Sequence, residues 1–315
     1  MAKFRPKKTG IVFTTLFALA VFTAIFLTIS SYGYFGDQTP TWNEVLDQAE
    51  AGSNAFKASA ENYVGFIDCG QGDCEVLVSN GSVAIIDTGT NANEQSTVQR
   101  LKNLGITTVD ALILTHPHED HIGGADKVFD AFEIKSVYMM KPSNANTPTT
   151  KVYEQTLEAI LNEGLTITQP KINSTLKIGD FNLKFLSPSK DYDDHNNNSI
   201  VIRADIKGKS FLFTGDAESE PEKDMLKNCK SDLNVDVLKV GHHGSKNSTT
   251  KEFLNAVSPK IAVVSCGEGN DYGHPHGATL KRLKDIEIYR TDLDSTVIVS
   301  IENSKLNVIT QGEKK

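Results

Sequence analysis

The sequence predicts an α/β domain that is preceded by one N-terminal transmembrane helix. From Tyr63 onward, short apolar runs bounded by glycine-rich turns alternate with segments of helical spacing, which is typical of α/β proteins. Before them, residues 11–30 form an uncharged run of 20 that is rich in Phe, Leu, Ile, Val and Ala. Such a run is long enough to cross a bilayer once. With 39 % hydrophobic residues in 315, the chain has ample apolar material for a core.

The segment before the apolar run predicts its orientation. Lys3, Arg5, Lys7 and Lys8 precede the run, and no acid occurs before residue 31. Because positive flanks stay on the cytoplasmic side, the rest of the chain is expected outside the membrane. A cleaved signal peptide is the alternative, but the run exceeds the usual apolar region of one, and no Ala-x-Ala site follows closely. We therefore predict a single-pass protein of the cell membrane with an extracytoplasmic domain.

Composition divides the chain into three parts. Residues 1–30 are the cytoplasmic tip and anchor, residues 31–60 a juxtamembrane linker with scattered Gly and Pro, and residues 61–315 the folded domain. An oxidising compartment permits Cys69 and Cys74 to pair across their short loop. Reduced, buried cysteines are equally compatible with the sequence.

The charge balance bears on the partners of the exported part. Four of the 32 bases lie in the first 30 residues, so the remainder carries 28 bases against 40 acids, a formal charge of −12. Stable non-specific binding to nucleic acid relies on Lys and Arg that neutralise phosphates, and this balance argues against it. A phosphodiester substrate is not excluded, because bound metal ions supply local positive charge.

The elements of the folded domain follow from local patterns. Apolar runs between turn residues predict strands, and apolar residues three or four apart predict helices. The helices over 93–104 and 150–162 are expected to end at Gly105 and Gly164. The predicted strands are 64–68, 75–79, 83–87, 109–114, 134–140, 165–169, 175–178, 181–186, 200–206, 210–213, 235–240 and 261–265, and the other predicted helices are 125–132, 218–227 and 250–257.

A dense group of metal-ligand side chains follows the strand over 109–114. His116, His118, Asp120 and His121 place three imidazoles and a carboxylate within six residues. Side chains two apart in extended chain point the same way, so His116 and His118 are expected to face one point. The next turn can bring Asp120 and His121 to a second point nearby. Imidazole with carboxylate suits Zn²⁺, Mn²⁺ or Fe rather than Ca²⁺ or Mg²⁺.

The remaining histidines are also clustered. The eight histidines fall in four places along the chain, at 116–121, at 195, at 242–243 and at 274–276. Scattered packing histidines would not group in this way. Two further strands end in polar residues of the same kind, in Thr-Gly-Asp216 and in Gly-His242-His243-Gly. The pattern therefore favours one metal site built from distant segments.

The combined motifs resemble those of a known family. They are Asp68-Cys-Gly-Gln-Gly-Asp73, Ile85-Ile-Asp-Thr-Gly89, His116-Pro-His-Glu-Asp-His121, Phe211-Leu-Phe-Thr-Gly-Asp216, Leu238-Lys-Val-Gly-His-His-Gly-Ser245 and Tyr272-Gly-His-Pro-His276. Together they resemble the metallo-β-lactamase-fold hydrolases, in particular the branch that contains the competence proteins. The resemblance implies a four-layer αβ/βα sandwich with the metals at one edge between the sheets. It also implies a free-standing domain, since the sequence shows one membrane span only.

The same resemblance implies roles for single residues. It suggests two divalent ions, Zn²⁺ or Mn²⁺, with Asp216 bridging them. His116 and His118 would bind the first ion, and Asp120, His121 and His242 the second. The family usually has a third histidine for the first ion; either His195 supplies it here or that ion is held less tightly. Asp120 would also orient the attacking hydroxide, and His243 or His274 would donate a proton to the leaving oxygen or hold a phosphate oxygen. Substrate would be contacted by Ser245, Asn198 and Tyr272. Asp87 and Asp68 would support the metal ligands by hydrogen bonding.

We accordingly expect a metal-dependent hydrolase of phosphodiesters outside the membrane, related to DNA-uptake proteins and with nuclease-like activity on DNA. Metal binding lowers the pKa of water towards about 7, so no serine or cysteine nucleophile is required. One alternative is a hydrolase of cell-wall or lipid phosphodiesters such as phosphorylcholine esters, which the acidic surface favours. Another is a non-catalytic metal-binding module of an uptake apparatus.

Overall fold

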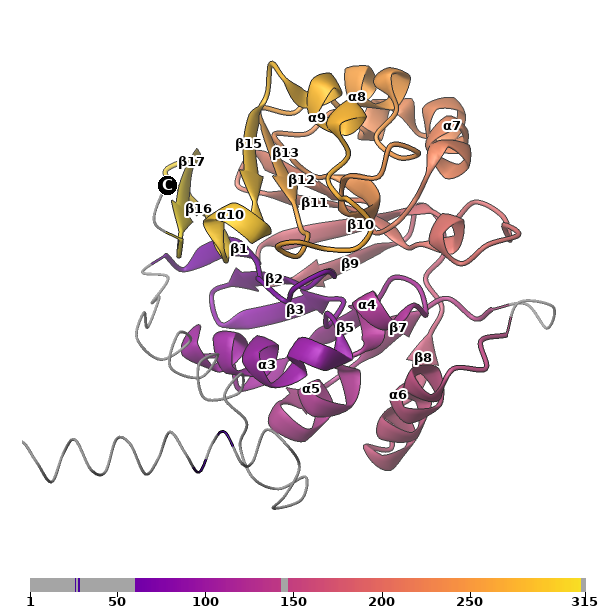
Figure 1. Ribbon diagram of the computed structural model, residues 1–315, viewed down its shortest axis with the longest axis vertical. Coiled ribbons are helices and arrows are strands. Elements are labelled where there is room, and N and C mark those ends of the chain that lie inside the picture. The colour runs from indigo at the N-terminus through magenta and orange to yellow at the C-terminus, as the bar shows by residue number, and fades with distance from the viewer. Residues whose placement is uncertain (1–25, 27, 29–59, 143–146, 313–315) are drawn as a thin grey trace, which may run out of the picture. The chain divides into compact units, whose positions relative to one another are not determined.

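The computed structural model describes residues 26, 28, 60–142 and 147–312 (Figure 1). Two β-sheets pack face to face, and helices cover the outer face of each, which is the four-layer αβ/βα sandwich that the resemblance implies. The predicted transmembrane segment and the linker lie almost entirely outside the described residues. Within the part that is described, no helix combines the length and apolar character needed to cross a membrane.

The first sheet carries the metal-ligand loop. Within the described residues its strands run in the order β17-β16-β1-β2-β3-β5-β7-β8, and β3, β5, β7 and β8 pair in parallel. Their carboxyl ends therefore meet at one edge. The strands are β1 (Asn62–Phe66), β2 (Glu75–Ser79), β3 (Ser82–Ile86), β5 (Ala111–Leu114), β7 (Val137–Met139), β8 (Ile167–Thr168), β16 (Val297–Glu302) and β17 (Lys305–Thr310), with β4 (Thr108–Val109) and β6 (Glu133–Ile134) as a separate pair.

The second sheet brings the other ligands. Its order is β15-β14-β13-β12-β11-β10-β9, and the pairs from β12 to β15 are parallel. The carboxyl ends of β12, β13 and β14 thus lie together, as do those of β3 and β5 in the first sheet. The strands are β9 (Thr175–Ile178), β10 (Phe181–Ser187), β11 (Val201–Ile206), β12 (Lys209–Phe213), β13 (Val237–Lys239), β14 (Ile261–Val264) and β15 (Glu287–Arg290).

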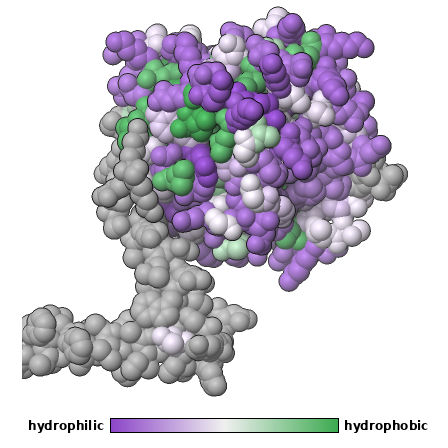
Figure 2. All heavy atoms as spheres, turned by 45° about the horizontal axis from the view of Figure 1, so that its top comes forward, coloured by the Kyte–Doolittle hydropathy of each residue, from purple (hydrophilic) through white to green (hydrophobic). Residues whose placement is uncertain are grey.

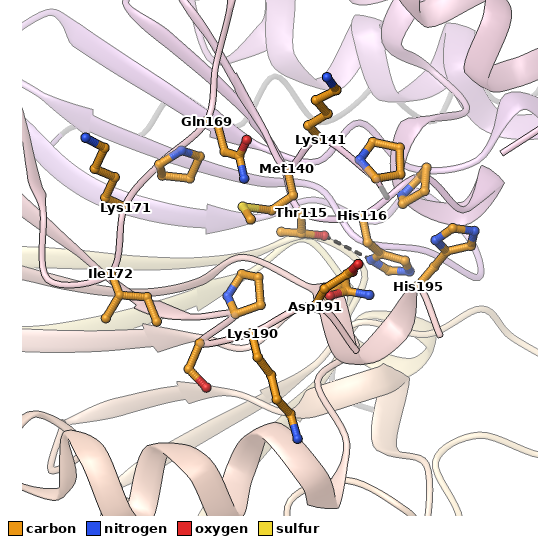
Figure 3. A pocket seen from close by; sticks show the side chains of 16 residues that line it. Thr115, His116, Met140, Lys141, Gln169, Lys171, Ile172, Lys190, Asp191 and His195 are labelled. Atoms are coloured by element: carbon orange, nitrogen blue, oxygen red, sulfur yellow. Dashed lines mark hydrogen bonds between the residues drawn. The ribbon is translucent and has the colours of Figure 1, made fainter. Parts of the chain in front are cut away.

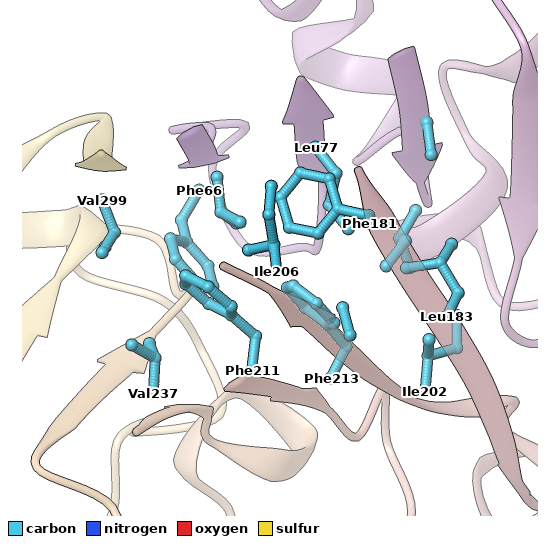
Figure 4. Packing of buried hydrophobic residues seen from close by; sticks show 14 of the residues in the cluster. Phe66, Leu77, Phe181, Leu183, Ile202, Ile206, Phe211, Phe213, Val237 and Val299 are labelled. Carbon is cyan, nitrogen blue, oxygen red and sulfur yellow. The ribbon is translucent and has the colours of Figure 1, made fainter. Parts of the chain in front are cut away.

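Alternation along the strands builds three apolar layers. Ala111 and Ile113 of β5 face the second sheet, while Leu112 and Leu114 face the helices of the first. In β12, Phe211 and Phe213 point into the space between the sheets, where Figure 4 shows them close to Phe66. Burying a side chain of this size contributes about 1.5–3 kcal/mol. Both sheets are consequently held in fixed register beneath the site.

The helices close the outer faces. Helices α3 (Glu94–Asn103), α5 (Ala125–Ala131) and α6 (Lys151–Asn162) pack on the first sheet. Helices α7 (Ser219–Asn228), α8 (Lys251–Val257) and α9 (Gly277–Leu283) pack on the second. Short helices α4 (Glu119–Ile122) and α10 (Thr291–Asp294) complete the set in the described residues. The face drawn in Figure 2 is mainly hydrophilic, with scattered apolar residues.

Most predicted elements are present, with instructive differences. The strand expected over 134–140 is split into β6 and β7, because β6 pairs with β4 in the small sheet and β7 pairs with β5 in the first sheet. The turn after His118 is a short helix, α4. The structure also contains α9, β16 and β17, in segments where no element was predicted. All four cysteines are free and buried, so Cys69 and Cys74 do not form a disulfide in this structure.

Candidate metal centre

The predicted ligands meet where three strands end. β5 leads into His116 and His118, β12 leads into Asp216, and β13 leads into the pair His242 and His243. Helix α4 presents Asp120 and His121 on the turn that follows. His116, His121, Asp216 and His243 are all buried. Segments that are about 100 residues apart in sequence therefore converge on one point, as their clustering predicted.

Asp216 lies at the middle of this group. One of its oxygens, Oδ1, lies 3.3 Å from Nε2 of His121 and 3.6 Å from Nε2 of His243. The other, Oδ2, lies 3.5 Å from Nε2 of His242 and 3.9 Å from Nε2 of His116. Each carboxylate oxygen thus faces a different pair of histidines. This is the arrangement needed for a carboxylate that bridges two ions.

One set of ligands is closed. Ligand atoms of Asp120, His121, Asp216 and His243 all lie within 4.8 Å of one another. Nε2 of His121, Nε2 of His243 and Oδ1 of Asp216 are buried and have no hydrogen-bond partner among the described residues. Unpaired buried polar atoms cost free energy unless something satisfies them. Two imidazole nitrogens and two carboxylates in this arrangement fit a divalent transition-metal ion.

Asp87 holds His121 from behind. Its Oδ2 lies 2.7 Å from Nδ1 of His121, which leaves Nε2 directed at Asp216. The carboxylate also accepts hydrogen bonds from the backbone N–H and the hydroxyl of Thr115, at 2.7 Å and 2.6 Å. Such partners orient a metal-binding imidazole and fix its tautomer. Asp87 thus occupies the supporting position that the sequence predicted for it.

Asp73 contacts His243 from behind, but the hydrogen bond of the ring nitrogen on that side is made with a backbone carbonyl oxygen. Its Oδ1 lies 3.2 Å from Nδ1 of His243, which also lies 2.9 Å from the carbonyl oxygen of Ser265. The buried ammonium of Lys239 contacts the other oxygen of Asp73. Burial by itself raises the pKa of Asp73, but Lys239 and His243 outweigh it and lower the pKa to about 2. Asp73 is therefore a charged buried carboxylate, stabilised by a buried cation.

The prediction for Asp68 is corrected by this arrangement. Asp68 lies 3.5 Å from the guanidinium of Arg100 and accepts a hydrogen bond of 3.2 Å from the hydroxyl of Ser295, away from the ligands. The same Gly-Gln-Gly-Asp motif supplies Asp73 at its other end. A Cβ on Gly72 would lie 2.3 Å from the carbonyl oxygen of Asp120, so only glycine lets this loop pack against the metal loop. Gly72, which this close approach requires, was the feature of the sequence that could have pointed to Asp73 as a neighbour of the metal ligands.

His242 and His243 exchange the positions that the sequence suggested. His243, not His242, completes the closed set with Asp120 and His121. His242 lies on the side of His116, near Oδ2 of Asp216, and its Nδ1 lies 2.9 Å from Oε1 of Glu218. Both histidines have a left-handed backbone, with φ of 48° and 50°. Such a backbone costs about 1–3 kcal/mol per residue and turns the two rings to opposite sides of Asp216.

The other set is less compact. His116 and His118 do face the same way, with Nε2 of His116 3.1 Å from Nδ1 of His118. The ring of His195 stands edge-on to His118, with ring centroids 5.5 Å apart. Nδ1 of His116 lies 3.3 Å from the hydroxyl of Ser199, which also accepts a hydrogen bond from the backbone N–H of Asp216. His195 therefore lies next to His118 but does not belong to the closed set of Asp120, His121, Asp216 and His243. Ligation of a metal ion by His195 stays a prediction.

A cavity of about 480 Å³ lies against these ligands. His274, Tyr272 and His118 are among the residues that line it, and the rings of His274 and Tyr272 stack with centroids 5.7 Å apart. Burial and the neighbouring His243 and His242 lower the pKa of His274 to about 4, so its imidazole is neutral at pH 7. Its Nδ1 is buried and has no partner among the described residues. His274 is thus placed to exchange a hydrogen bond with a molecule in the cavity.

The two other predicted substrate residues have structural partners. The side-chain amide of Asn198 donates to the carbonyl oxygens of Tyr192 and Asp194, and its Oδ1 accepts from the N–H of Tyr192. It therefore stabilises its own loop. Ser245 is buried, and its hydroxyl accepts a hydrogen bond from the backbone N–H of Asn247. Neither side chain lines the cavity over Asp120, Asp216 and His243, but Asn198 lines a second cavity beside His116.

Fold and ligands together define the class of protein. Residues 67–268 match the metallo-beta-lactamase superfamily, to which this chain belongs. The curated relatives include a recombination protein and a competence protein. ComE operon protein 3 of Bacillus subtilis is 36 % identical over 267 residues, 78 % of this chain and 34 % of that protein. Competence protein ComA of Neisseria gonorrhoeae is 31 % identical over 243 residues, 73 % of this chain and 31 % of that protein. This chain spans about a third of the length of these relatives.

Solved structures support the fold alone. CmlA, a diiron beta-hydroxylase from Streptomyces venezuelae, superposes with a TM-score of 0.53 at 15 % identity, over 83 % of this chain and 60 % of that one. At this identity the likeness says nothing about which metal or reaction belongs to this chain. It does support the four-layer arrangement of sheets and helices described above.

Proposed function

We propose that this chain is a metal-dependent phosphodiesterase, tethered to the membrane, that cleaves DNA strands outside the cytoplasm. The observation that carries the proposal is Asp216, whose two oxygens face two groups of histidines beside a cavity. Two-metal sites that share a carboxylate are the typical machinery for hydrolysing phosphate esters. Two relatives are named for recombination and for competence, which both concern DNA.

The donor set fits divalent ions of the Zn²⁺ or Mn²⁺ kind. When bound, such ions supply Lewis acidity and activate water for attack. His121 and His243 offer their Nε2 atoms, because Asp87 and the carbonyl oxygen of Ser265 occupy the opposite ring nitrogens. Asp120, with Oδ2 3.2 Å from Nε2 of His243, reaches the same point from α4. These residues would hold a cation at the point that their ligand atoms surround.

The cavity side of the site supplies the polar groups for a substrate. The neutral imidazole of His274 can donate or accept one hydrogen bond to a phosphate or leaving oxygen. The side chain of Asn270 fixes the backbone of His274: it accepts a hydrogen bond from the N–H of His274 at 3.0 Å and donates one to the carbonyl oxygen of His274 at 2.6 Å. His274 is therefore held in place before substrate arrives, which lowers the cost of ordering it.

The location follows from the sequence. The uncharged run over 11–30 and the four bases before it favour a signal anchor, with the folded domain outside the membrane. A metal-dependent enzyme outside the cytoplasm would meet DNA that reaches the cell surface. The part of this chain after residue 30 has a formal charge of −12, which favours release of a DNA product over stable non-specific binding of nucleic acid.

Hydrolysis of two substrates by the full chain in detergent tests the proposal. A labelled single-stranded oligonucleotide represents DNA, and bis(p-nitrophenyl) phosphate represents any phosphodiester. With saturating Zn²⁺ or Mn²⁺ we expect both to be cleaved, and we expect Asp216→Asn to lose nearly all of both activities. The exposed Asp285→Asn serves as matched control and is expected to retain them. Absence of any cleavage under these conditions would refute a phosphodiesterase.

A second candidate keeps the chemistry and changes the substrate. The acidic charge of the exported part favours a small cell-wall or lipid phosphodiester, such as a phosphorylcholine ester, over a long polyanion. Cleavage of bis(p-nitrophenyl) phosphate and a phosphorylcholine ester, without cleavage of DNA, would favour this candidate.

A further inference from the structure

A second cavity of about 430 Å³ adjoins the metal centre. Thr115, His116 and Pro117 of the ligand loop form one side of it, and three other loops form the rest (Figure 3). Pro117 lines both this cavity and the one over the ligands, so the two are neighbours on either side of a single residue. A molecule longer than one phosphodiester could therefore extend from one into the other.

Three lysines from three separate loops surround this second cavity. Lys141 follows β7, Lys171 lies between β8 and β9, and Lys190 follows β10. Only one acid, Asp191, lines the same cavity, although acids outnumber bases by eight in the whole chain. Positive charge is thus concentrated here against the average of the protein. Local charge of this kind focuses the potential that attracts an anion.

Two of the lysines are available for a ligand. Lys190 is paired with Glu220, at 2.7 Å, and lies over the ring of Tyr192. For Lys141 and Lys171 the structure gives no ion pair within the described residues, and both side chains are exposed. Two positive charges without a counter-ion at the rim of one cavity favour an anionic ligand.

The walls between the lysines combine apolar side chains with polar ones such as Gln169 and Ser189. Met140, Ile172 and three prolines contribute the apolar part, and Figure 3 shows Met140 and Ile172 on the same cavity as Lys171. A volume near 430 Å³ falls within the range of about 300–1,000 Å³ that small-molecule sites occupy. Partly apolar walls with cations at the rim match a nucleotide, which combines a flat base with a charged phosphate. The prolines are Pro142, Pro170 and Pro188.

We propose that this cavity, with Lys141 and Lys171 at its rim, binds the nucleotide next to the cleaved bond, and that each of the two ammonium groups contacts a phosphate of the strand. The proposal rests on the phosphodiesterase function above and names its substrate as a polymer with at least two phosphates. A small phosphodiester fills only the cavity over the ligands. The lysine cavity therefore distinguishes a strand from a single ester.

The double variant Lys141→Gln/Lys171→Gln tests the proposal in the full chain. We expect its KM for a single-stranded 12-mer to rise by about tenfold, because two charge-assisted contacts are lost. Its kcat and KM for bis(p-nitrophenyl) phosphate should not change. The slope of log Kd for the 12-mer against log salt should fall by about 1.4, from about 0.7 for each lost phosphate contact. Lys251→Gln/Lys305→Gln removes the same charge from exposed positions outside the cavity and should behave as the unmodified chain.

Several results would overturn the proposal. An unchanged KM and salt slope for the 12-mer would exclude the cavity as its site. Equal losses on both substrates would show that the lysines affect the metal centre or the fold. An equal effect of the control pair would show that only net charge matters. If the unmodified chain cleaves neither substrate, the function fails, and fluorescence anisotropy of the bound 12-mer still tests the cavity by itself.

Discussion

Replacing the buried Lys239 by methionine tests the charge network beneath the metal ligands. Lys239 is 1 % exposed, and its ammonium contacts Asp73. Although burial alone would raise the pKa of Asp73, Lys239 and His243 lower it from 3.8 to about 2. At 1.36 kcal/mol per pKa unit, the fold favours the charged carboxylate by about 2 kcal/mol. Lys239 supplies the largest part of that effect.

The variant Lys239→Met should therefore leave a buried carboxylate without its principal counter-charge. Breaking one partner of a buried ion pair costs about 3–5 kcal/mol, and the 2 kcal/mol above places this case near the lower end. We expect the free energy of unfolding to fall by about 3 kcal/mol at pH 7 and 25 °C. Urea denaturation of chelator-treated protein measures it, since bound metal would otherwise add its own stabilisation.

The double variant Lys239→Met/Asp73→Asn is the control. Removing both charges should restore part of the lost stability, so the two single effects should not add. A loss below about 1 kcal/mol in Lys239→Met, or full additivity in the double-mutant cycle, would refute an ion pair that matters to the fold. The metal affinity of the same proteins reports separately on how well Asp73 orients His243.

Three further predictions concern metal binding and pH. Asp87→Asn should raise the Kd of the tighter metal by about 10–100-fold, because His121 loses its charged partner, whereas Asp68→Asn should leave it unchanged in a chelator-competition titration. His195→Ala should leave that tighter step intact and weaken only the second, since His195 stands outside the closed set. Burial raises the pKa of Glu222 to about 7, so the folded state binds a proton that the unfolded state releases, and stability should fall as pH rises from about 4.5 to 7. Urea denaturation at pH 4.5 and at pH 8 measures this change in the free energy of unfolding, and Glu222→Gln should make it smaller by about 3 kcal/mol. An identical pH dependence in both proteins would contradict the prediction.

Local sequence patterns predicted the framework of the fold. In β5 and β12, residues on both faces are buried, and such strands appear as continuous apolar runs whose ends are marked by polar ligands. Because His116 and Asp216 directly follow those runs, their placement at one edge of the sandwich was predictable. Asp87 was predictable for the same reason, since it follows β3.

The directions of adjacent side chains were not predictable. Which of His242 and His243 faces Asp120 depends on two successive left-handed residues, a conformation that histidine rarely adopts. It is stabilised from outside the pair, by the hydrogen bond from the N–H of His242 to the carbonyl oxygen of Gly215 and by the contact of His243 with Asp73. Both partners are distant in sequence. The resemblance therefore placed His242 with Asp120 and His121, whereas the structure places His243 there.

The excess of buried carboxylates links metal binding to stability. Asp73, Asp87 and Asp216 are fully or almost fully buried around His121 and His243, and Lys239 is the cation paired with one of them. Divalent ions would offset the remaining negative charge, so a folded chain without them is expected to be less stable. At a free metal concentration of 100 times Kd, binding to the folded state adds about 2.7 kcal/mol. Chelation should lower the Tm, and Zn²⁺ or Mn²⁺ should restore it in the unmodified chain but not in Asp216→Ala. A Tm that is independent of metal in both proteins would mean that these buried carboxylates are neutralised by protons, and that the centre is not a metal site.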